Sequence, residues 1–283
     1  MKLLRYGPKG QEKPGILDAQ GQIRDLSGKV QDIAGDVLSP AGLDKLRALD
    51  IRSLPAVSGS PRIGPCVGRV PNVLCIGLNY SDHAKETGAK IPGQPILFNK
   101  HSSAISGPND DVVIPKDSVK TDWEIELGVC IGTQARHVAE KDALKHVAGY
   151  FTANDVSERQ FQIEMEGQWT KGKSADTFAP MGPWLVTADE VKDPQNLKLW
   201  CKVNGKFMQN GSTKTMIFGV ATIVSYLSRF MTLLPGDVIF TGTPPGVGLG
   251  MKPSPIFLKP GDVMELGVEG LGEQKQKVVA YPG

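Results

Sequence analysis

The stretch from Thr121 to Ile131, TDWEIELGVCI, places two carboxylates inside an otherwise apolar run. Glu124 and Glu126 lie two residues apart, and in an extended chain side chains at that spacing project from the same face. The β-branched and apolar residues that follow predict a strand that is half buried in a sheet. Two neighbouring carboxylates on such a strand repel each other, and their burial is costly unless a cation neutralises them.

Two interpretations of this pair stay open from the residues alone. Carboxylate oxygens suit Mg²⁺, Mn²⁺ or Ca²⁺, so the strand could deliver two ligands to a metal site. Equally, Glu124 and Glu126 could lie on the wet face of an edge strand, where no ion is needed. Glu-x-Glu alone is a common pattern and does not decide between them.

Composition excludes several classes of protein. A length of 283 residues allows one large domain or two modest ones. A formal net charge of +2 gives no reason to expect a nucleic-acid partner. The four cysteines are isolated, which favours a reducing compartment and argues against structural zinc. No stretch approaches the roughly 20 apolar residues of a membrane span, and the N-terminus lacks the pattern of a signal peptide, so we expect a cytoplasmic protein with no membrane contact.

Turn and cap signals divide the chain into two predicted domains, a small N-terminal α/β domain at residues 1–60 and a second domain at 70–283. The Gly-, Pro- and Ser-rich segment 58–69 is the expected linker. In the first domain, Ser39 followed by Pro40 predicts the start of a helix. Short strands are expected there at residues 3–6, 14–17 and 22–26.

The second domain is expected to mix strands with a few helices. Asn204-Gly205 is the strongest hairpin signal of the chain, and Pro-Gly pairs at 235–236 and 260–261 each predict a turn into a strand. Further strands are expected at 73–78, 95–100 and 150–153, helices at 140–148, from Ser157 and at 216–230 with Thr213 or Thr215 as its cap, and a loop at 170–183.

Other polar residues are candidates for chemistry. His83 and Glu86, three residues apart, would lie side by side on a short helix, either as a general base with its orienting carboxylate or as an ordinary solvated pair. Asp155 follows a predicted strand end, where it could deliver a ligand or cap a helix. Lys173 is either solvated or directed at an anion. Glycines in 241–248 favour close backbone approach to a ligand.

Six segments taken together resemble the fumarylacetoacetate hydrolase family, and they occur in family order. They are GLNYSDHAKE (77–86), GPND with the following IP (107–115), DWEIELGVCIG (122–132), NDVSERQFQ (154–162), KGKSADTFAPMGP (171–183) and GDVIFTGTPPGVG (236–248). The N-terminal MKLLRYGPKGQEKPGILD is similar to one bacterial branch, which holds hydrolases of 2,4-diketo sugar acids and proteins named ureidoglycolate lyase or hydroxymuconate-type isomerase.

The resemblance implies an α+β, mostly β fold: a mixed β-roll or sandwich with a small N-terminal α/β domain, assembled as a homodimer. It implies Mg²⁺ or Mn²⁺, with Ca²⁺ as a substitute in crystals, held by Glu124, Glu126 and Asp155. It also implies that His83 and Glu86 activate water and that Lys173 is an active-site lysine. The expected substrate contacts are Arg159, Gln162 and Thr243. Ser174-Ala175 stands where relatives of the branch often have Gly-Phe, so the substrate is less defined than the reaction class.

The implied activity is divalent-metal-dependent hydrolysis of a C–C bond in an acylpyruvate or 2,4-diketo acid, releasing pyruvate and a carboxylic acid. One alternative keeps the ion but changes the chemistry: a ureidoglycolate lyase, or a decarboxylase or isomerase acting on a 2-keto or 2-hydroxymuconate-type acid. A second alternative is a non-enzymatic, β-rich protein that binds small acids. The small-molecule keto acid is the expected partner in the first case.

Overall fold

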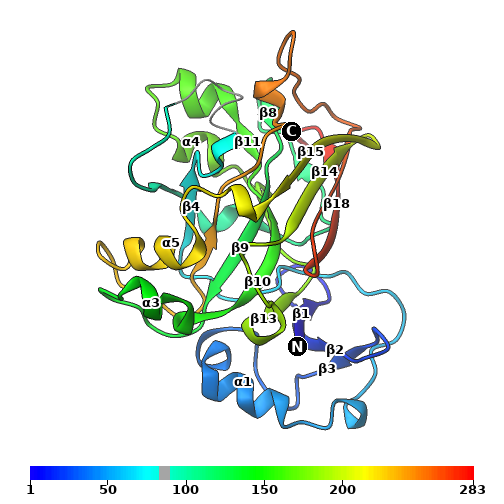
Figure 1. The fold of residues 1–283 in the computed structure, drawn as a ribbon. Coiled ribbons are helices and arrows are strands. Elements are labelled where there is room, and N and C mark those ends of the chain that lie inside the picture. Colours follow the sequence, from blue (N-terminus) through cyan, green and yellow to red (C-terminus); the bar gives the residue numbers. More distant parts are fainter. Residues whose placement is uncertain (83–89) are drawn as a thin grey trace.

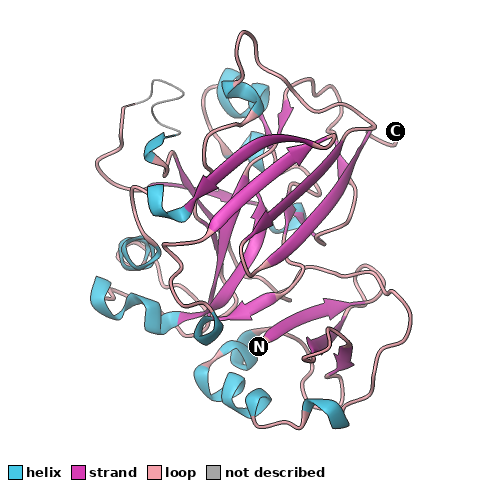
Figure 2. Cartoon of the chain, turned by 45° about the vertical axis from the view of Figure 1, so that its right-hand side comes forward, coloured by secondary structure: helices cyan, strands magenta, loops and turns pink. Residues whose placement is uncertain are grey.

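The structure, a computed structural model, describes residues 1–82 and 90–283. Within them the chain forms two large sheets and two small ones, with short helices at the periphery (Figures 1 and 2). The fold is α+β and mostly β, as the sequence predicts. None of the described helices has the length and apolar character needed to cross a membrane.

The larger sheet is mixed and has nine strands. Their order is β3 (Ile23–Asp25), β2 (Lys13–Leu17), β1 (Lys2–Tyr6), β13 (Leu185–Thr187), β10 (Val147–Asn154), β9 (Ile125–Ile131), β16 (Val238–Phe240), β4 (Val73–Gly77) and β5 (Ile96–Lys100). β9 pairs antiparallel with both β10 and β16, while β16 runs parallel to β4. The central strands are almost wholly apolar and buried.

The second large sheet packs against β9 and β10. Its order is β15 (Lys206–Ser212), β14 (Lys198–Val203), β17 (Val263–Val268), β18 (Gly272–Val279) and β7 (Val112–Val113). The two-stranded sheets pair β11 (Ser157–Glu158) with β8 (Thr121–Asp122), and β12 (Ala179–Pro180) with β6 (Ile105–Ser106). The described α-helices of four or more residues are α1 (Pro40–Arg47), α3 (Glu140–Ala143), α4 (Thr170–Lys173) and α5 (Val220–Leu227).

The predicted strand through the two glutamates differs in two ways from the structure. It is interrupted, because β8 ends at Asp122 and β9 begins at Ile125. It is also fully buried rather than half buried, since the five-stranded sheet packs against β9 and every residue of β9 is inaccessible. The edge-strand interpretation of Glu124 and Glu126 is therefore wrong, as both side chains are inside the protein.

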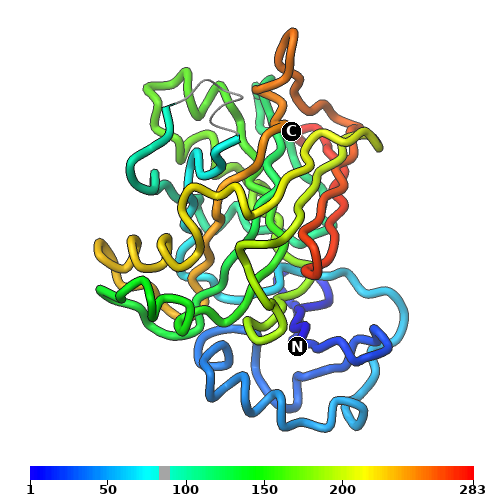
Figure 3. The backbone as a smooth tube through the Cα atoms, in the orientation of Figure 1, coloured from blue at the N-terminus to red at the C-terminus, as the bar shows by residue number. Residues whose placement is uncertain are grey.

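The N-terminal strands extend the large sheet. β1 pairs antiparallel with β13, with Leu3 opposite Leu185. Helix α1 begins as predicted: the Ser39 side chain accepts a hydrogen bond of 3.1 Å from the Gly42 N–H, and Pro40 is the first helical residue. Figure 3 shows this N-terminal part of the backbone, in blue, below the strands that follow. The division into domains at 1–60 and 70–283 stays a prediction.

Turn signals were reliable guides, whereas helix lengths were not. The hairpin between β14 and β15 has its turn at Asn204-Gly205, and both residues have a positive φ. The two Pro-Gly turns lead into β16 and β17. The helix predicted at 140–148 ends at Ala143, because a 3₁₀ turn and then β10 follow. The helix predicted at 216–230 is only α5, and Thr213 and Thr215 lie in a separate 3₁₀ turn, where Thr213 is hydrogen-bonded to Leu197.

Two further local predictions were wrong around the site. In place of a helix from Ser157, the chain forms the short strand β11 and then a π-helical turn at Gln160–Glu164. The segment 170–183, predicted to be a loop, contains α4 and β12. In both places main-chain pairing with residues distant in sequence decides the conformation, since β11 pairs with β8 and β12 with β6.

Candidate active site

Three carboxylates from two strand ends meet inside the protein. Glu124 immediately precedes β9, Glu126 lies in it, and Asp155 follows the end of the neighbouring β10. One oxygen of each lies within 4.8 Å of the others. The pairing of β9 with β10 causes this convergence, because Asp155 donates its backbone N–H to the Glu124 carbonyl at 2.9 Å.

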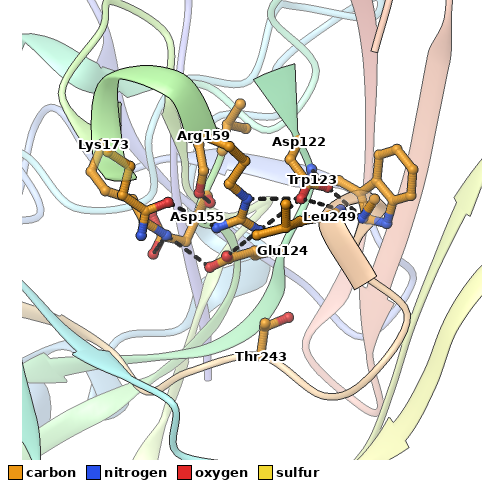
Figure 4. A network of polar contacts seen from close by, with 12 residues as sticks. Asp122, Trp123, Glu124, Asp155, Arg159, Lys173, Thr243 and Leu249 are labelled. Carbon is orange, nitrogen blue, oxygen red and sulfur yellow. Dashed lines mark hydrogen bonds and ion pairs between the residues drawn. The ribbon is translucent and has the colours of Figure 1, made fainter. Parts of the chain in front are cut away.

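Two buried cations contact these carboxylates and line the same space. Lys173, the last residue of α4, lies 2.9 Å from Glu124 Oε2 and 2.8 Å from Asp155 Oδ2. Arg159 lies 2.6 Å from Glu124 Oε1 and 2.8 Å from Asp122 Oδ2 (Figure 4). Because both oxygens of Glu124 accept from cations, its side chain is held in one orientation.

Asp122 fixes the position of the Arg159 guanidinium. Its oxygens accept backbone N–H groups of Gly248 at 2.6 Å and Leu249 at 2.9 Å, in addition to the guanidinium. Arg159 Nη1 in turn donates to Gln162 Oε1 at 3.0 Å. The side chains are buried throughout, so these bonds form in a medium where charge interactions are strong.

The pKa values separate the two glutamates. Burial alone would raise the pKa of Glu124, but the charges of Lys173 and Arg159 outweigh it and hold the pKa at about 2. For Glu126, burial and the negative charges of Asp155 and Glu124 raise the pKa well above its usual range. Within the part of the chain that the structure describes, Glu126 forms no ion pair. It is the carboxylate that most needs a further cation.

A glycine turn after β16 approaches Glu126. Gly242 donates its backbone N–H to Glu126 Oε2 at 2.7 Å and has a φ of +96°. A Cβ at this position would lie 2.7 Å from the Cβ of Asn79. The expected close approach of the 241–248 backbone is thus to a carboxylate of the site.

Thr243 is committed to protein partners. Its hydroxyl donates to the Ile125 carbonyl at 2.8 Å and accepts from Gln209 Nε2 at 2.8 Å. Gln209 also accepts the Ile125 N–H at 3.0 Å. To donate to a substrate carboxylate, the Thr243 hydroxyl would have to turn away from Ile125.

A cavity of about 220 Å³ opens over this network. Six of the predicted site residues line it: Glu124, Glu126, Arg159, Gln162, Lys173 and Thr243. Asp155 is beneath them, against Lys173. The predicted pair His83 and Glu86 lies outside the described residues. The roles of all these residues in catalysis or binding stay predictions.

The donor set fits a hard divalent cation. All three candidate ligands are carboxylates, which Mg²⁺ and Mn²⁺ prefer. Among the residues that the structure describes, the four acidic side chains of the site face three cations, which leaves one acidic group without a cationic partner. The acidic residues are Asp122, Glu124, Glu126 and Asp155, and the cations are Lys100, Arg159 and Lys173. The group left without a cation is Glu126, which lines the cavity and which a bound divalent ion would hold in its ionised form.

Lys100 and Asp122 were missed by the sequence analysis. Asp122 continues the period-two spacing of Glu124 and Glu126, so the same alternation would have found it. Lys100, the last residue of β5, lies 2.5 Å from Asp155 Oδ1. Its only signal is a lysine at the end of an apolar strand, which is ordinarily a solvated strand terminus.

Comparison with known proteins gives one family. The family model described as the fumarylacetoacetate (FAA) hydrolase C-terminal region matches residues 72–279. A curated protein from Burkholderia ambifaria is 65% identical over 276 residues, covering 98% of each chain, and bears the provisional name of a hydrolase with no substrate given.

Solved structures of hydrolases and of an isomerase share the fold. A fumarylacetoacetate hydrolase from Exiguobacterium antarcticum is 38% identical, with a TM-score of 0.85 over 99% of this chain and 100% of that one. A maleylpyruvate hydrolase from Sphingobium sp. SYK-6 is 28% identical, with 0.81 over 99% and 100%. A 2-hydroxyhepta-2,4-diene-1,7-dioate isomerase from Mycobacterium marinum is 32% identical, with 0.75 over 100% of both.

Proposed function

The chain belongs to the fumarylacetoacetate hydrolase family, and from that premise we propose that it is a divalent-metal-dependent hydrolase of a C–C bond in an acylpyruvate or 2,4-diketo acid. The products would be pyruvate and a carboxylic acid. The observation that carries the proposal is the buried cluster of Glu124, Glu126 and Asp155 beside a cavity lined by Arg159 and Lys173.

Glu124, Glu126 and Asp155 would hold the ion, Mg²⁺ or Mn²⁺. A bound divalent ion supplies electrophilic stabilisation of the oxyanion that develops when the C–C bond breaks. Lys173 keeps its ammonium at the cavity wall, because burial, which would lower its pKa, is outweighed by the charges of Asp155 and Glu124, and its pKa is raised. A permanent cation there favours the enolate of pyruvate as leaving fragment.

Arg159 and Gln162 would orient the substrate. The guanidinium is fixed by Asp122 and Glu124, and its pKa is raised although burial opposes this, so it stays charged throughout the working pH range. The family resemblance assigns activation of the attacking water to His83 with Glu86. A neutral histidine oriented by a carboxylate can accept the proton of water as it attacks the distal carbonyl.

The alternative chemistry is isomerisation, which a relative of the same fold is named for. An isomerase, a decarboxylase or a ureidoglycolate lyase would use the same stabilised oxyanion but would not need water at the distal carbonyl. Product analysis separates these cases: pyruvate with an acid, against an isomer, CO₂, or glyoxylate with urea.

The test is pyruvate release from a panel of acylpyruvates and 2,4-diketo acids, measured with Mg²⁺, with Mn²⁺ and with EDTA. We expect metal-dependent release by the wild type and by Glu273→Gln, an exposed glutamate used as the matched control, and none by Glu126→Gln. His83→Ala should keep metal binding and lose hydrolysis. Release that EDTA does not reduce, or that Glu126→Gln retains, would contradict the proposal.

The resemblance also supports a homodimer that binds a small keto acid. The sequence composition supports a location in the cytoplasm, with neither nucleic acid nor membrane as partner. Size-exclusion chromatography with light scattering measures the oligomeric state. A monomer at assay concentration with full activity would contradict the dimer.

A further inference from the structure

Much of the lining of the cavity over the acidic cluster is apolar. Beside the charged residues, six apolar side chains form its apolar wall: Leu78, Phe98, Ile163, Trp169, Val247 and Leu249. A substrate held at the carboxylate cluster by its polar end would place its remaining part against this wall. The chemistry of the wall therefore bears on what that part can be.

Trp169 is built firmly into the wall. It approaches the backbone of Gly77 so closely that a Cβ there would lie 2.4 Å from Trp169 Cζ3. Its ring meets Phe98 edge to face, with centroids 5.2 Å apart. Lys173 in turn lies 5.0 Å from the centroid of the Phe98 ring. The indole thus occupies a fixed place one helical turn before the active-site lysine.

The cations of the cavity are already paired. Arg159 contacts Asp122 and Glu124, and Lys173 contacts Glu124 and Asp155. Neither has a charge to spare for a second substrate carboxylate. No other cationic side chain lines the cavity among residues 1–82 and 90–283.

Among residues 1–82 and 90–283, the charges of the site match one substrate carboxylate. The excess of one negative charge becomes one positive charge when a divalent ion binds. One substrate carboxylate neutralises this charge, and a second would be buried beside carboxylates with no cationic partner among the described residues. Desolvation of an unpaired charge is costly, while an alkyl or aryl group gains from contact with the wall.

We propose that the site selects 2-oxo acids whose distal, acyl end is uncharged and apolar, and that Trp169 with Phe98 determines this selectivity. The inference rests on the proposed function, because it assumes that the 2-oxo acid end lies at the acidic cluster. It also separates this chain from the relative of the same fold that is named for a dioate.

The test compares two 2-oxo acids of equal chain length, 2-oxohexanoate and 2-oxoadipate, which differ in a terminal methyl or carboxylate. Their binding to the full chain saturated with Mg²⁺ is measured by calorimetry, with pyruvate as the shared fragment. We expect 2-oxohexanoate to bind at least about tenfold more tightly than 2-oxoadipate. Two acylpyruvates whose acyl groups differ in the same way, in a terminal methyl or carboxylate, should show the same preference in kcat/KM.

Variants locate the selectivity. Trp169→Ala should weaken the binding of 2-oxohexanoate by about tenfold and leave the affinity for pyruvate unchanged. Trp200→Ala, which removes an indole away from the cavity in β14, is the matched control and should change neither. If Trp169→Ala does not fold, Phe98→Leu serves in its place, and the wild-type comparison of the two acids decides by itself.

The outcomes separate a failure of the proposed selectivity from a failure of the proposed function. Binding of both acids with 2-oxoadipate equal or tighter overturns the inference alone. Equal affinities of wild type and Trp169→Ala for 2-oxohexanoate overturn the role of Trp169. With Mg²⁺ shown to be bound, failure of every 2-oxo acid to bind and of every acylpyruvate to react overturns the proposed function, and the inference with it.

Discussion

Lys100 Nζ lies 2.5 Å from Asp155 Oδ1, and both side chains are fully buried. The same ammonium donates to the Val156 carbonyl at 2.9 Å. Burial lowers the pKa of Lys100, and the charge of Asp155 opposes this. Since Lys173 occupies the other oxygen of Asp155, the carboxylate is held between two lysines and presented to Glu124 and Glu126 in one orientation.

Lys100→Met should weaken divalent-metal binding by about 10- to 100-fold, as loss of an outer partner of a metal ligand typically does. It should also lower the free energy of unfolding by about 3–5 kcal/mol, because it leaves a buried carboxylate with one partner fewer. Calorimetric titration with Mn²⁺ and urea unfolding measure the two effects. Lys145→Met, which breaks an exposed ion pair with Asp142, should change neither. Unaltered Mn²⁺ affinity would show that Lys100 does not position Asp155.

Glu126→Gln should stabilise the metal-free protein while it removes the stabilisation by metal. The carboxylate is buried with Asp155 and Glu124, whereas an amide oxygen can still accept from Gly242 without the charge. We expect a gain on the order of 1–3 kcal/mol with EDTA present. Thermal unfolding with EDTA and with Mg²⁺ is the measurement. A variant that is less stable without metal, yet is still stabilised by Mg²⁺, would refute this assignment.

Gly242→Ala should lower both stability and metal affinity. The residue has a φ of +96°, and a Cβ would lie 2.7 Å from Asn79 Cβ, so the N–H that supports Glu126 must move. A loss of about 1–3 kcal/mol is expected from the backbone strain alone. Gly28→Ala is the control, because a Cβ there meets nothing within 4 Å. Equal melting temperatures of the two variants would count against the predicted strain.

Arg62→Met should destabilise the protein at neutral pH but not in acid. Arg62 contacts Glu12 at 2.9 Å and Asp110 at 2.6 Å. Burial would raise the pKa of each carboxyl, but the Arg62 guanidinium together with backbone N–H donors outweighs it, and both pKa values are lowered. A lowered folded-state pKa adds stability above the unfolded-state pKa, and this is lost as pH falls through the folded-state value.

The free energy of unfolding of the wild type should therefore exceed that of Arg62→Met by about 1–3 kcal/mol at pH 7. The difference should shrink as pH falls from about 5 to about 3. Urea unfolding over that pH series measures it. The exposed Arg52→Met should match the wild type throughout. A difference that is constant with pH would mean that packing of the Arg62 side chain, and not its charge, stabilises the protein.

Local signals predicted the turns and the strands well. Asn204-Gly205 and the two Pro-Gly pairs specify their backbone conformation through the residues themselves, so no distant contact is needed. Helix lengths were overestimated, as at 216–230. The apolar spacing there includes residues outside the helix, such as Ile217, which donates its N–H to the Asn79 carbonyl before α5 begins. The family resemblance named Lys173 and Arg159 as site residues although the local structure of their segments was predicted wrongly. Both contact Glu124 in the structure, and their roles stay predictions.

The sequence by itself determined the fold family, the core strands and the acidic residues, because these follow from residue type, spacing and motif order along the chain. Only the tertiary structure decided that Lys100 supports Asp155, that Asp122 anchors Arg159, and that Trp169 is seated on Gly77. These contacts join residues 37 to 92 positions apart, or bring side chains against a backbone. No local pattern encodes them, since they depend on which strands become neighbours in the sheet.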